Sequence, residues 1–215
     1  MALKVYVTPV TPFQQNCSVL VCERTLEAAV VDPGGDLERI RQVVATAGAT
    51  SKKIFLTHAH LDHAGATAEL ARETGALIEG PHKGDLFWIE KLDEQSRMFG
   101  FGKTESFTPD RWLEQGDRVQ IGGTELEVYH CPGHTPGHLV FFIRDQKLAI
   151  VGDVLFAGSV GRTDFPGSDH RQLISSIRNN LWPLGNEVVF IPGHGPRSTF
   201  GAERQNNPFV GDNVA

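Results

Sequence analysis

The sequence predicts an α+β domain in which two β-sheets lie between outer helices. Two observations support this class. Strand-like segments come in pairs joined by short turns, as in antiparallel hairpins, and helical segments follow the first strands and precede the last one. No linker or low-complexity stretch divides the 215 residues, so we expect one domain that covers residues 1–215.

The predicted strands are short runs of apolar or β-branched residues that end at turn residues. They are Lys4–Val7, Ser18–Cys22, Ala28–Val31, Ile54–Leu56, Leu77–Ile78, Val119–Ile121, Thr124–Tyr129, Leu139–Ile143, Leu148–Val151 and Val188–Ile191. Gly122-Gly123 joins two of these strands in a hairpin, because adjacent glycines permit the positive φ angles of a tight turn.

The predicted helices have apolar residues on one face or are rich in alanine. They cover residues 36–47, 64–74, 83–92, 169–181 and 199–206. Asp36 is the expected N-cap of the first helix, Gly75 ends the second, and Asp169 opens the fourth. Residues 81–115 are crowded with aromatic side chains, and beyond residue 92 we expect irregular chain there. This segment is interpreted either as a lid with a small core of its own or as a wall of the substrate pocket.

Composition and charge exclude several classes of partner. The net charge is −6 without a basic run, which argues against a nucleic-acid-binding surface. No apolar run approaches the length of a membrane span, and the N-terminal residues lack the features of a signal peptide. The three cysteines are too sparse for a disulfide framework. We therefore expect a cytoplasmic protein that binds neither nucleic acid nor membrane.

The segment Thr57–His63 holds four potential metal ligands within six residues. Residues two apart in extended backbone point to the same side, so His58 and His60 present their imidazoles together. Asp62 and His63 follow where the chain turns into a helix, so they face another direction. This geometry suits two adjacent metal ions better than one.

Three further positions follow the ends of predicted strands. His134 and His194 each end a Pro-Gly-His turn, and Asp153 follows a third strand. Because catalytic residues recur on loops at the ends of a rigid sheet, we expect these side chains to meet the histidine-rich segment. The predicted metal ligands are His58, His60, Asp62, His63, His134, Asp153 and His194.

Imidazole and carboxylate ligands predict hydrolytic metal chemistry. They suit zinc, iron or manganese, and we expect two divalent ions, zinc first and iron or manganese as alternatives. If Asp153 bridges the ions, each ion has three further ligands and a bridging hydroxide completes its coordination. Metal binding lowers the pKa of water to about 7, so this hydroxide could attack a carbonyl carbon. Asp62 and Asp153 are the predicted catalytic residues.

These residues resemble, in order, the motifs of the metallo-β-lactamase superfamily. Within it, the chain is similar to the hydroxyacylglutathione hydrolase (glyoxalase II) group, in its short, single-domain bacterial form. The stretches that support this resemblance are Gln15-Asn16-Cys17, Val31-Asp32-Pro33-Gly34-Gly35, Cys131-Pro132-Gly133-His134-Thr135-Pro136-Gly137-His138, Gly161-Arg162-Thr163-Asp164-Phe165 and Asn207-Pro208-Phe209.

The resemblance implies a four-layer αββα sandwich, with two mixed sheets inside, helices on the outer faces and the metals at one edge. It assigns one metal to His58, His60 and His134, and the other to Asp62, His63 and His194, with Asp153 as the bridge. The implied reaction is hydrolysis of the thioester of S-D-lactoylglutathione, or of a similar hydroxyacyl thioester. The substrate is thus a small molecule, and we expect a monomer or a homodimer.

Several alternatives stay open at this point. Arg162 could bind a substrate carboxylate or be a surface arginine, and His138 could form a hydrogen bond near the metals or be a core histidine. The stretch around Arg162 also resembles persulfide dioxygenases, in which residues corresponding to His58, His134 and Asp153 hold one iron. Another hydrolase of the superfamily, such as a lactonase, is a third interpretation. A non-enzymatic metal module is disfavoured, because the ligands leave room for solvent on two ions.

Overall fold

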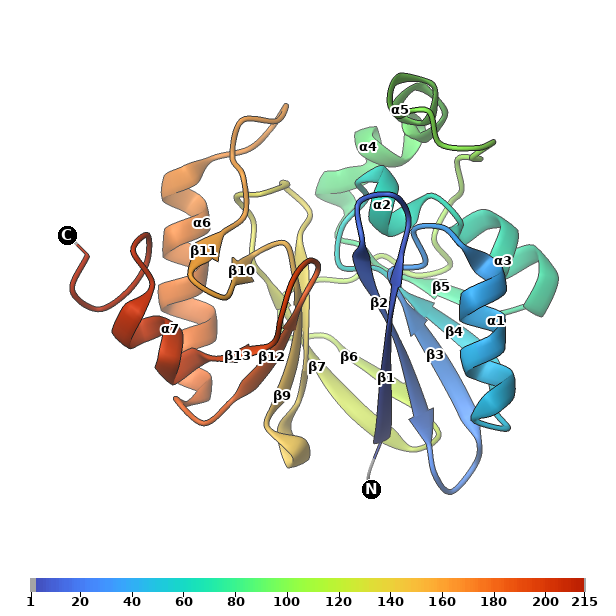
Figure 1. Cartoon of the computed structure of the whole chain (residues 1–215), viewed down its shortest axis with the longest axis horizontal. Helices are drawn as coiled ribbons and strands as arrows, with labels where there is room; N and C mark the ends of the chain where they lie inside the picture. The colour runs from blue at the N-terminus through green and yellow to red at the C-terminus, as the bar shows by residue number, and fades with distance from the viewer. Residues whose placement is uncertain (1–2, 215) are drawn as a thin grey trace.

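The structure is a computed structural model, and it describes residues 3–214. Residues 1, 2 and 215 lie outside the described residues. The predicted domain of residues 1–215 includes all three, and the N-terminus predicted to lack a signal peptide includes the first two. Two sheets lie face to face, and helices cover their outer surfaces (Figure 1).

The first sheet has five strands in the order β1-β2-β3-β4-β5. They are β1 (Leu3–Val10), β2 (Gln15–Cys22), β3 (Glu27–Val31), β4 (Thr50–Phe55) and β5 (Leu77–Glu79). The first three pair antiparallel, whereas β3, β4 and β5 run parallel, so the sheet is mixed. Helices α1 (Leu37–Thr46) and α3 (Thr67–Thr74) pack on its outer face, and Leu37, Ile40 and Leu70 supply their buried side chains.

The second sheet has six strands in the order β13-β12-β9-β8-β7-β6. They are β6 (Arg118–Ile121), β7 (Thr124–His130), β8 (Leu139–Ile143), β9 (Leu148–Gly152), β12 (Val189–Pro192) and β13 (Ser198–Thr199). Strands β9 and β12 run parallel and the other neighbours antiparallel, so this sheet is also mixed. A small hairpin of β10 (Leu155–Phe156) and β11 (Ser159–Val160) follows β9.

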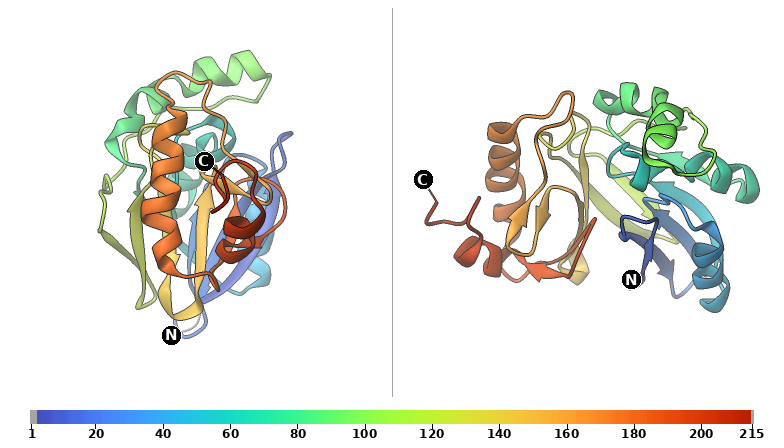
Figure 2. Two further views of the ribbon diagram at one scale, coloured as in Figure 1. Left: turned by 90° about the vertical axis from the view of Figure 1, so that its left-hand side faces the viewer. Right: turned by 45° about the horizontal axis from the view of Figure 1, so that its top comes forward.

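Helix α6 (His170–Ser176) lies along the outer face of the second sheet and continues as a π-helical stretch, η3 (Ile177–Leu181) (Figure 2). Three short helices complete this half: η2 (Arg144–Gln146), η4 (Trp182–Leu184) and α7 (Phe200–Asn206). Asp169 caps α6 as predicted, because its carboxylate accepts the N–H of Gln172 at 3.0 Å.

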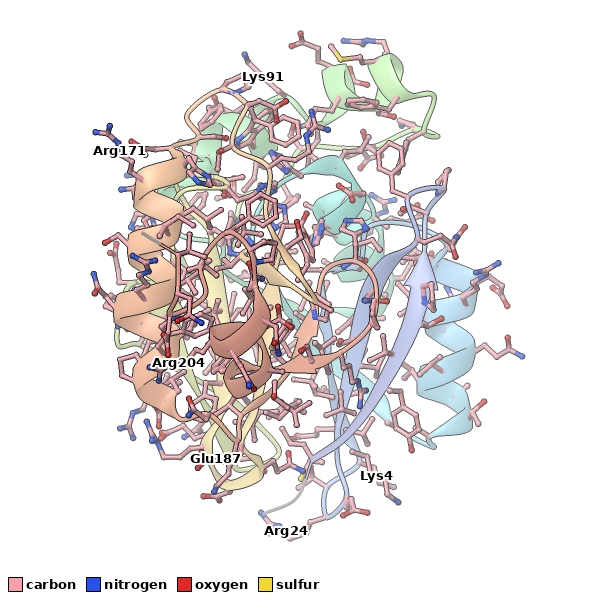
Figure 3. All side chains as sticks on the ribbon, turned by 60° about the vertical axis from the view of Figure 1, so that its left-hand side comes forward. Lys4, Arg24, Lys91, Arg171, Glu187 and Arg204 are labelled. Atoms are coloured by element: carbon pink, nitrogen blue, oxygen red, sulfur yellow. The ribbon has the colours of Figure 1, made fainter. Side chains whose placement is uncertain are left out.

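The apolar core falls into three layers, one under each set of outer helices and one between the sheets. In the central layer Phe55 of β4 stacks on Phe141 of β8, with ring centroids 5.4 Å apart. Charged side chains such as Lys91, Arg171 and Glu187 project outward from the surface (Figure 3). The layers confirm the predicted αββα sandwich of two mixed sheets with helices on the outer faces.

The structure differs from the sequence predictions at the first two helices. The helix predicted over residues 64–74 begins later, as α3, and a separate short helix, α2 (Leu61–Ala64), precedes it. Asp36 occupies the N-cap position of α1 but does not cap it; its carboxylate instead accepts the N–H of Thr11 at 2.9 Å and fixes the β1–β2 turn. The N-cap prediction for Asp36 was therefore wrong, because a tertiary partner competes for the carboxylate.

Residues 81–115 contain more helix than predicted. After the 3-10 turn η1 (Lys83–Asp85), helix α4 (Leu86–Glu90) ends at Lys91, and a second helix, α5 (Leu92–Phe99), continues where irregular chain was expected. This segment stands above the edge of the first sheet, beside α2 (Figure 1). Among residues 3–214, no helix is both long enough and apolar enough to cross a membrane.

Candidate metal centre

The seven predicted ligands meet at one edge of the two sheets. The segment Thr57–His63 leaves β4 in extended conformation and enters α2. His134 lies in the loop between β7 and β8, and Asp153 and His194 follow the ends of β9 and β12. The edge is therefore built from strand ends of both sheets, as the sequence predicted.

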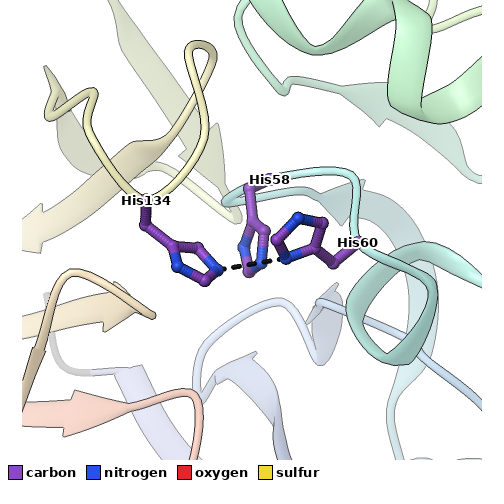
Figure 4. Close-up of side chains that lie close together, drawn as sticks. All are labelled: His58, His60 and His134. Carbon is purple, nitrogen blue, oxygen red and sulfur yellow. Dashed lines mark hydrogen bonds between the residues drawn. The ribbon is translucent and has the colours of Figure 1, made fainter. Parts of the chain in front are cut away.

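We call His58, His60 and His134 site one. Figure 4 shows the three imidazoles converging from two loops. Nδ1 of His60 lies 3.0 Å from Nε2 of His134, and one nitrogen of each ring lies within 4.8 Å of the others. All three side chains are buried. This arrangement could hold one metal ion.

We call Asp62, His63 and His194 site two. Oδ2 of Asp62 lies 3.1 Å from Nε2 of His194 and 3.8 Å from Nε2 of His63. His63 is fully buried, but the side chain of His194 is 29% exposed and that of Asp62 is 14% exposed. Site two could hold a second ion, and it is the more open of the two sites.

Asp153 lies between the two sites. Its Oδ1 is 3.3 Å from Nε2 of His63, and its Oδ2 is 3.6 Å from Nε2 of both His134 and His194. The carboxylate is therefore within reach of ligands from both sites, as expected of a bridging ligand. Gly193 makes this approach possible, because a Cβ there would lie only 2.0 Å from Oδ1 of Asp153.

Several buried atoms of the centre have no hydrogen-bond partner among the described residues. They include Nε2 of His58, Nε2 of His63 and Oδ1 of Asp153. Buried polar atoms are rarely left unpaired, so their convergence needs an explanation. A cation between them would satisfy these atoms, and the histidine and aspartate cluster therefore suits divalent metal ions.

Asp32 orients two of the ligands, although it lies near enough to His58 and His63 to be mistaken for one. Its carboxylate accepts hydrogen bonds from the backbone N–H of Thr57 (2.7 Å), from the Thr57 hydroxyl (2.6 Å) and from Nδ1 of His63 (2.9 Å). The Thr57 hydroxyl in turn lies 3.0 Å from Nδ1 of His58. With both Nδ1 atoms engaged, the Nε2 atoms are left free for metals.

Backbone carbonyls orient two further rings. Nδ1 of His134 donates to the carbonyl of Arg162 at 2.7 Å, and Nδ1 of His194 donates to the carbonyl of Phe13 at 3.1 Å. These tautomers follow from the hydrogen-bond partners. The sequence did not predict either carbonyl, nor the role of Asp32, because the partners come from distant parts of the chain.

The position of His138 decides between its two predicted roles, a hydrogen bond near the metals or a core histidine. Its Nε2 accepts the backbone N–H of Asp153 at 3.0 Å, and its ring stacks on His58 at 4.5 Å. His138 thus supports the position of Asp153 through a hydrogen bond near the predicted metal ligands, which is the first of its two predicted roles. Cys131 is buried in the core, as expected of a packing residue.

Residues from the 81–115 segment contact three successive residues of the segment Thr57–His63, which we call the metal loop. The carboxylate of Asp85 accepts the N–H of Ala59, and Oε1 of Gln95 accepts the N–H of Leu61. Between them, the ring of Trp88 stands edge-on to His60 with centroids 4.6 Å apart. The segment therefore braces the loop that carries His58 and His60.

Burial controls the protonation of site one. It holds the pKa of His58 and His60 well below the ordinary histidine value, and it lowers the pKa of His134 as well. These rings are consequently neutral near pH 7, which is the state that binds metal.

Carboxylates control the protonation of site two. Burial alone would lower the pKa of His63, but the charges of Asp153 and Asp62 outweigh it and raise that pKa well above the ordinary value. Burial likewise opposes a charge on His194, whose pKa is raised by Asp62 and Asp153. Without a metal ion, both rings therefore hold a proton more tightly than a free histidine does.

Arg162 lies at the rim of the centre. Its guanidinium is exposed, pairs with Asp164 at 2.8 Å and lies 4.7 Å from the centre of the Phe165 ring. Phe165 in turn packs edge-on against His60, with centroids 4.8 Å apart. The Arg162 side chain thus lies beside site one, and its guanidinium is already paired with the Asp164 carboxylate.

Known proteins share both the fold and the length of this chain. The sequence pattern of the metallo-beta-lactamase superfamily matches residues 10–194. The chain is 44% identical over 209 residues to "Hydroxyacylglutathione hydrolase GloC" of Haemophilus influenzae, which covers 97% of this chain and 98% of that protein.

Two solved structures resemble this one closely. The BLEG-1 B3 metallo-beta-lactamase superposes with a TM-score of 0.88 at 34% identity, over 96% of this chain and 99% of that chain. TTHA1623 in a di-iron-bound form superposes with a TM-score of 0.86 at 35% identity, over 95% of this chain and 100% of that chain. Together with the superfamily pattern across the metal centre, they show that the chain belongs to the metallo-β-lactamase superfamily.

Proposed function

We propose that this chain is a metal-dependent hydrolase that cleaves the thioester of S-D-lactoylglutathione or a similar hydroxyacyl thioester. The observation that carries the proposal is the convergence of three side chains at site one and three at site two, with Asp153 between them. The similarity to a hydroxyacylglutathione hydrolase over 97% of the chain supports the substrate class.

Site one would hold the first divalent ion and site two the second, with Asp153 shared by both. Zinc is the proposed metal, and iron or manganese are the alternatives; the di-iron-bound form of TTHA1623 makes iron a specific one to test. Ions held there would lower the pKa of a bound water to about 7 and polarise the thioester carbonyl.

The side chains around the centre have separate roles in this proposal. Asp62 and Asp153 are the proposed catalytic carboxylates: Asp153 would hold both ions, and Asp62, whose side chain is 14% exposed, would accept a proton from the reacting water. Trp88 and Phe165 line the site-one side and exclude water from it. Arg162, exposed at the rim, is proposed to bind a substrate carboxylate.

The first test is hydrolysis of S-D-lactoylglutathione by the purified, zinc-loaded protein. Replacing Asp153 by Ala, or His134 by Ala, should abolish thioester cleavage while circular dichroism shows an intact fold. Full activity in either variant would contradict the proposal.

Metal analysis tests the alternative oxidoreductase function. About one iron per chain, with oxygen consumed when glutathione persulfide is supplied, would favour the persulfide dioxygenase interpretation. Two ions per chain without oxygen consumption would favour hydrolysis. Lactones should be assayed in parallel, because the same centre suits ester and thioester carbonyls alike.

A further inference from the structure

We propose that Asp85 is a positioning residue for site one, which ties the loop that carries His58 and His60 to the loop that carries His134. The inference rests on the metal centre of the proposed function. It concerns metal binding at site one and does not depend on which thioester is cleaved.

Asp85 is fully buried at the start of α4 and accepts three hydrogen bonds. Its Oδ2 accepts the backbone N–H of Ala59 at 3.0 Å and the hydroxyl of Thr135 at 2.8 Å. Its Oδ1 accepts the backbone N–H of Gly137 at 2.6 Å. One carboxylate therefore binds both loops at once.

Two of the three bonded positions lie next to predicted ligands. Ala59 stands between His58 and His60, and Thr135 follows His134. The two loops leave strands of different sheets, so local backbone structure does not fix the distance between their tips. The N–H of Leu139 donates to the carbonyl of Thr57 and joins the loops at their base, whereas Asp85 joins them beside the imidazoles.

The surrounding chain is shaped to admit this carboxylate. A Cβ on Gly137 would lie 2.6 Å from the backbone nitrogen of Asp85 and 2.7 Å from its carboxyl carbon, so only glycine allows the contact. His82 holds the same turn from the other side, since its N–H donates to the Gly137 carbonyl and its own carbonyl accepts the N–H of Asp85.

The charge on Asp85 is stabilised by these donors, since no ion pair to it is found within residues 3–214. Burial raises the pKa of Asp85 to about 6, while the hydrogen bonds from Thr135, Gly137 and Ala59 oppose the rise. Near pH 7.5 the carboxylate is therefore mostly ionised and acts purely as an acceptor. An amide at this position would turn an N–H group toward one of the three donors.

The test measures zinc affinity by chelator competition in two backgrounds of the full chain. His194→Ala removes a ligand of site two and leaves site one, whereas His134→Ala does the reverse. Asp85→Asn should weaken zinc binding roughly 10- to 100-fold in the first background, as expected when a partner that positions metal ligands is lost. In the second background the affinity should not change.

Asp110→Asn provides a matched control. Its carboxylate also accepts a backbone N–H, that of Ile78, but the contact is to β5 and not to either metal loop. This variant should keep the parent zinc affinity in both backgrounds. Cobalt provides a second readout, because its absorption spectrum at site one should change in Asp85→Asn and not in Asp110→Asn.

Two results would overturn the inference: unchanged affinity in the His194→Ala background, or equal weakening in both backgrounds, which would indicate a general loss of stability. If Asp85→Asn fails to fold, Thr135→Val decides, since it removes one of the three hydrogen bonds at nearly constant volume. Wild-type site-one affinity in Thr135→Val would then reject the proposal. Zinc affinity is measured without a thioester, so an inactive wild type would refute the proposed function and leave this result standing.

Discussion

Site one and site two share one carboxylate but differ in almost every other property. Site one consists of three buried, neutral imidazoles, whereas site two has a carboxylate, a raised histidine pKa and a ligand, His194, whose side chain is 29% exposed. Each site also has its own buried aspartate: Asp85 braces the loops of site one, and Asp32 bonds directly to His63 of site two. Two adjacent metal positions can therefore depend on different parts of one fold.

Removal of a ligand should have the largest effect and separate the sites most clearly. His134→Ala should lose the ion of site one, and thioester hydrolysis should fall about 1,000-fold or more, equivalent to about 4 kcal/mol of transition-state stabilisation. His194→Ala should retain one ion per chain. Metal counting by mass spectrometry, together with kcat, checks both; loss of both ions in each variant would show that the sites are not separable.

Acid should affect site two before site one. The pKa of His63 and His194 is raised above the ordinary 6.5 in the metal-free protein, so a metal ion must displace protons there. The pKa of His134 is lowered, so site one has fewer protons to displace. As pH falls, zinc affinity should decrease by up to about 100-fold per pH unit at site two when both rings are protonated.

The measurement is a zinc titration between about pH 5.5 and 8, in the His134→Ala and His194→Ala backgrounds. The first background reports site two and the second reports site one. Equal pH dependence in the two would contradict the contrast between buried imidazoles and imidazoles paired with carboxylates.

The replacement Asp32→Asn should mirror Asp85→Asn. An amide could not accept all the hydrogen bonds that Asp32 receives from Thr57 and His63, so the orientation of His63 would be lost. Zinc affinity should fall roughly 10- to 100-fold at site two. The effect at site one should be smaller, because Asp32 reaches His58 only through the Thr57 hydroxyl. A larger loss at site one would reverse the assignment of the two aspartates.

The smallest effect is expected at the rim. Arg162→Ala should raise KM for an anionic thioester roughly 3- to 10-fold with kcat nearly unchanged, because the exposed guanidinium would contact the substrate away from the scissile bond. The ion pair between Arg162 and Asp164 is exposed and contributes little to folding, so Asp164→Asn should leave stability almost unchanged. It should lower KM slightly by releasing Arg162. Steady-state kinetics decides, and an unchanged KM in both variants would make Arg162 a surface residue.

Local pattern was sufficient to predict most strands and the side chains that meet at the sheet edge. The alternation of His58 and His60 in extended chain, and the Pro-Gly-His turns before His134 and His194, depend on neighbouring residues only. Asp169 likewise caps α6 because donor and acceptor lie three residues apart. Such short-range rules are readable because the partner is part of the same segment.

Long-range partners were not predictable in this way. Asp36 has the residue type of an N-cap, yet it bonds to Thr11, 25 residues away. The 81–115 segment was interpreted as a lid or a pocket wall, and its contacts to Ala59 and Leu61 make it a brace of the metal loop. Its role as a wall of the substrate pocket remains a prediction.

Local sequence was enough to identify which side chains could bind metal, and at which strand ends they stand, because side-chain direction follows from local backbone geometry. The fold added the division of these two groups of ligands into a buried site and an open one. That division depends on burial and on carboxylates whose partners are far away along the chain. Asp32 lies 31 residues from its partner His63, and Asp85 lies 52 residues from its partner Gly137. Spacing along a chain carries no record of such distances, whereas the packing of two sheets sets them.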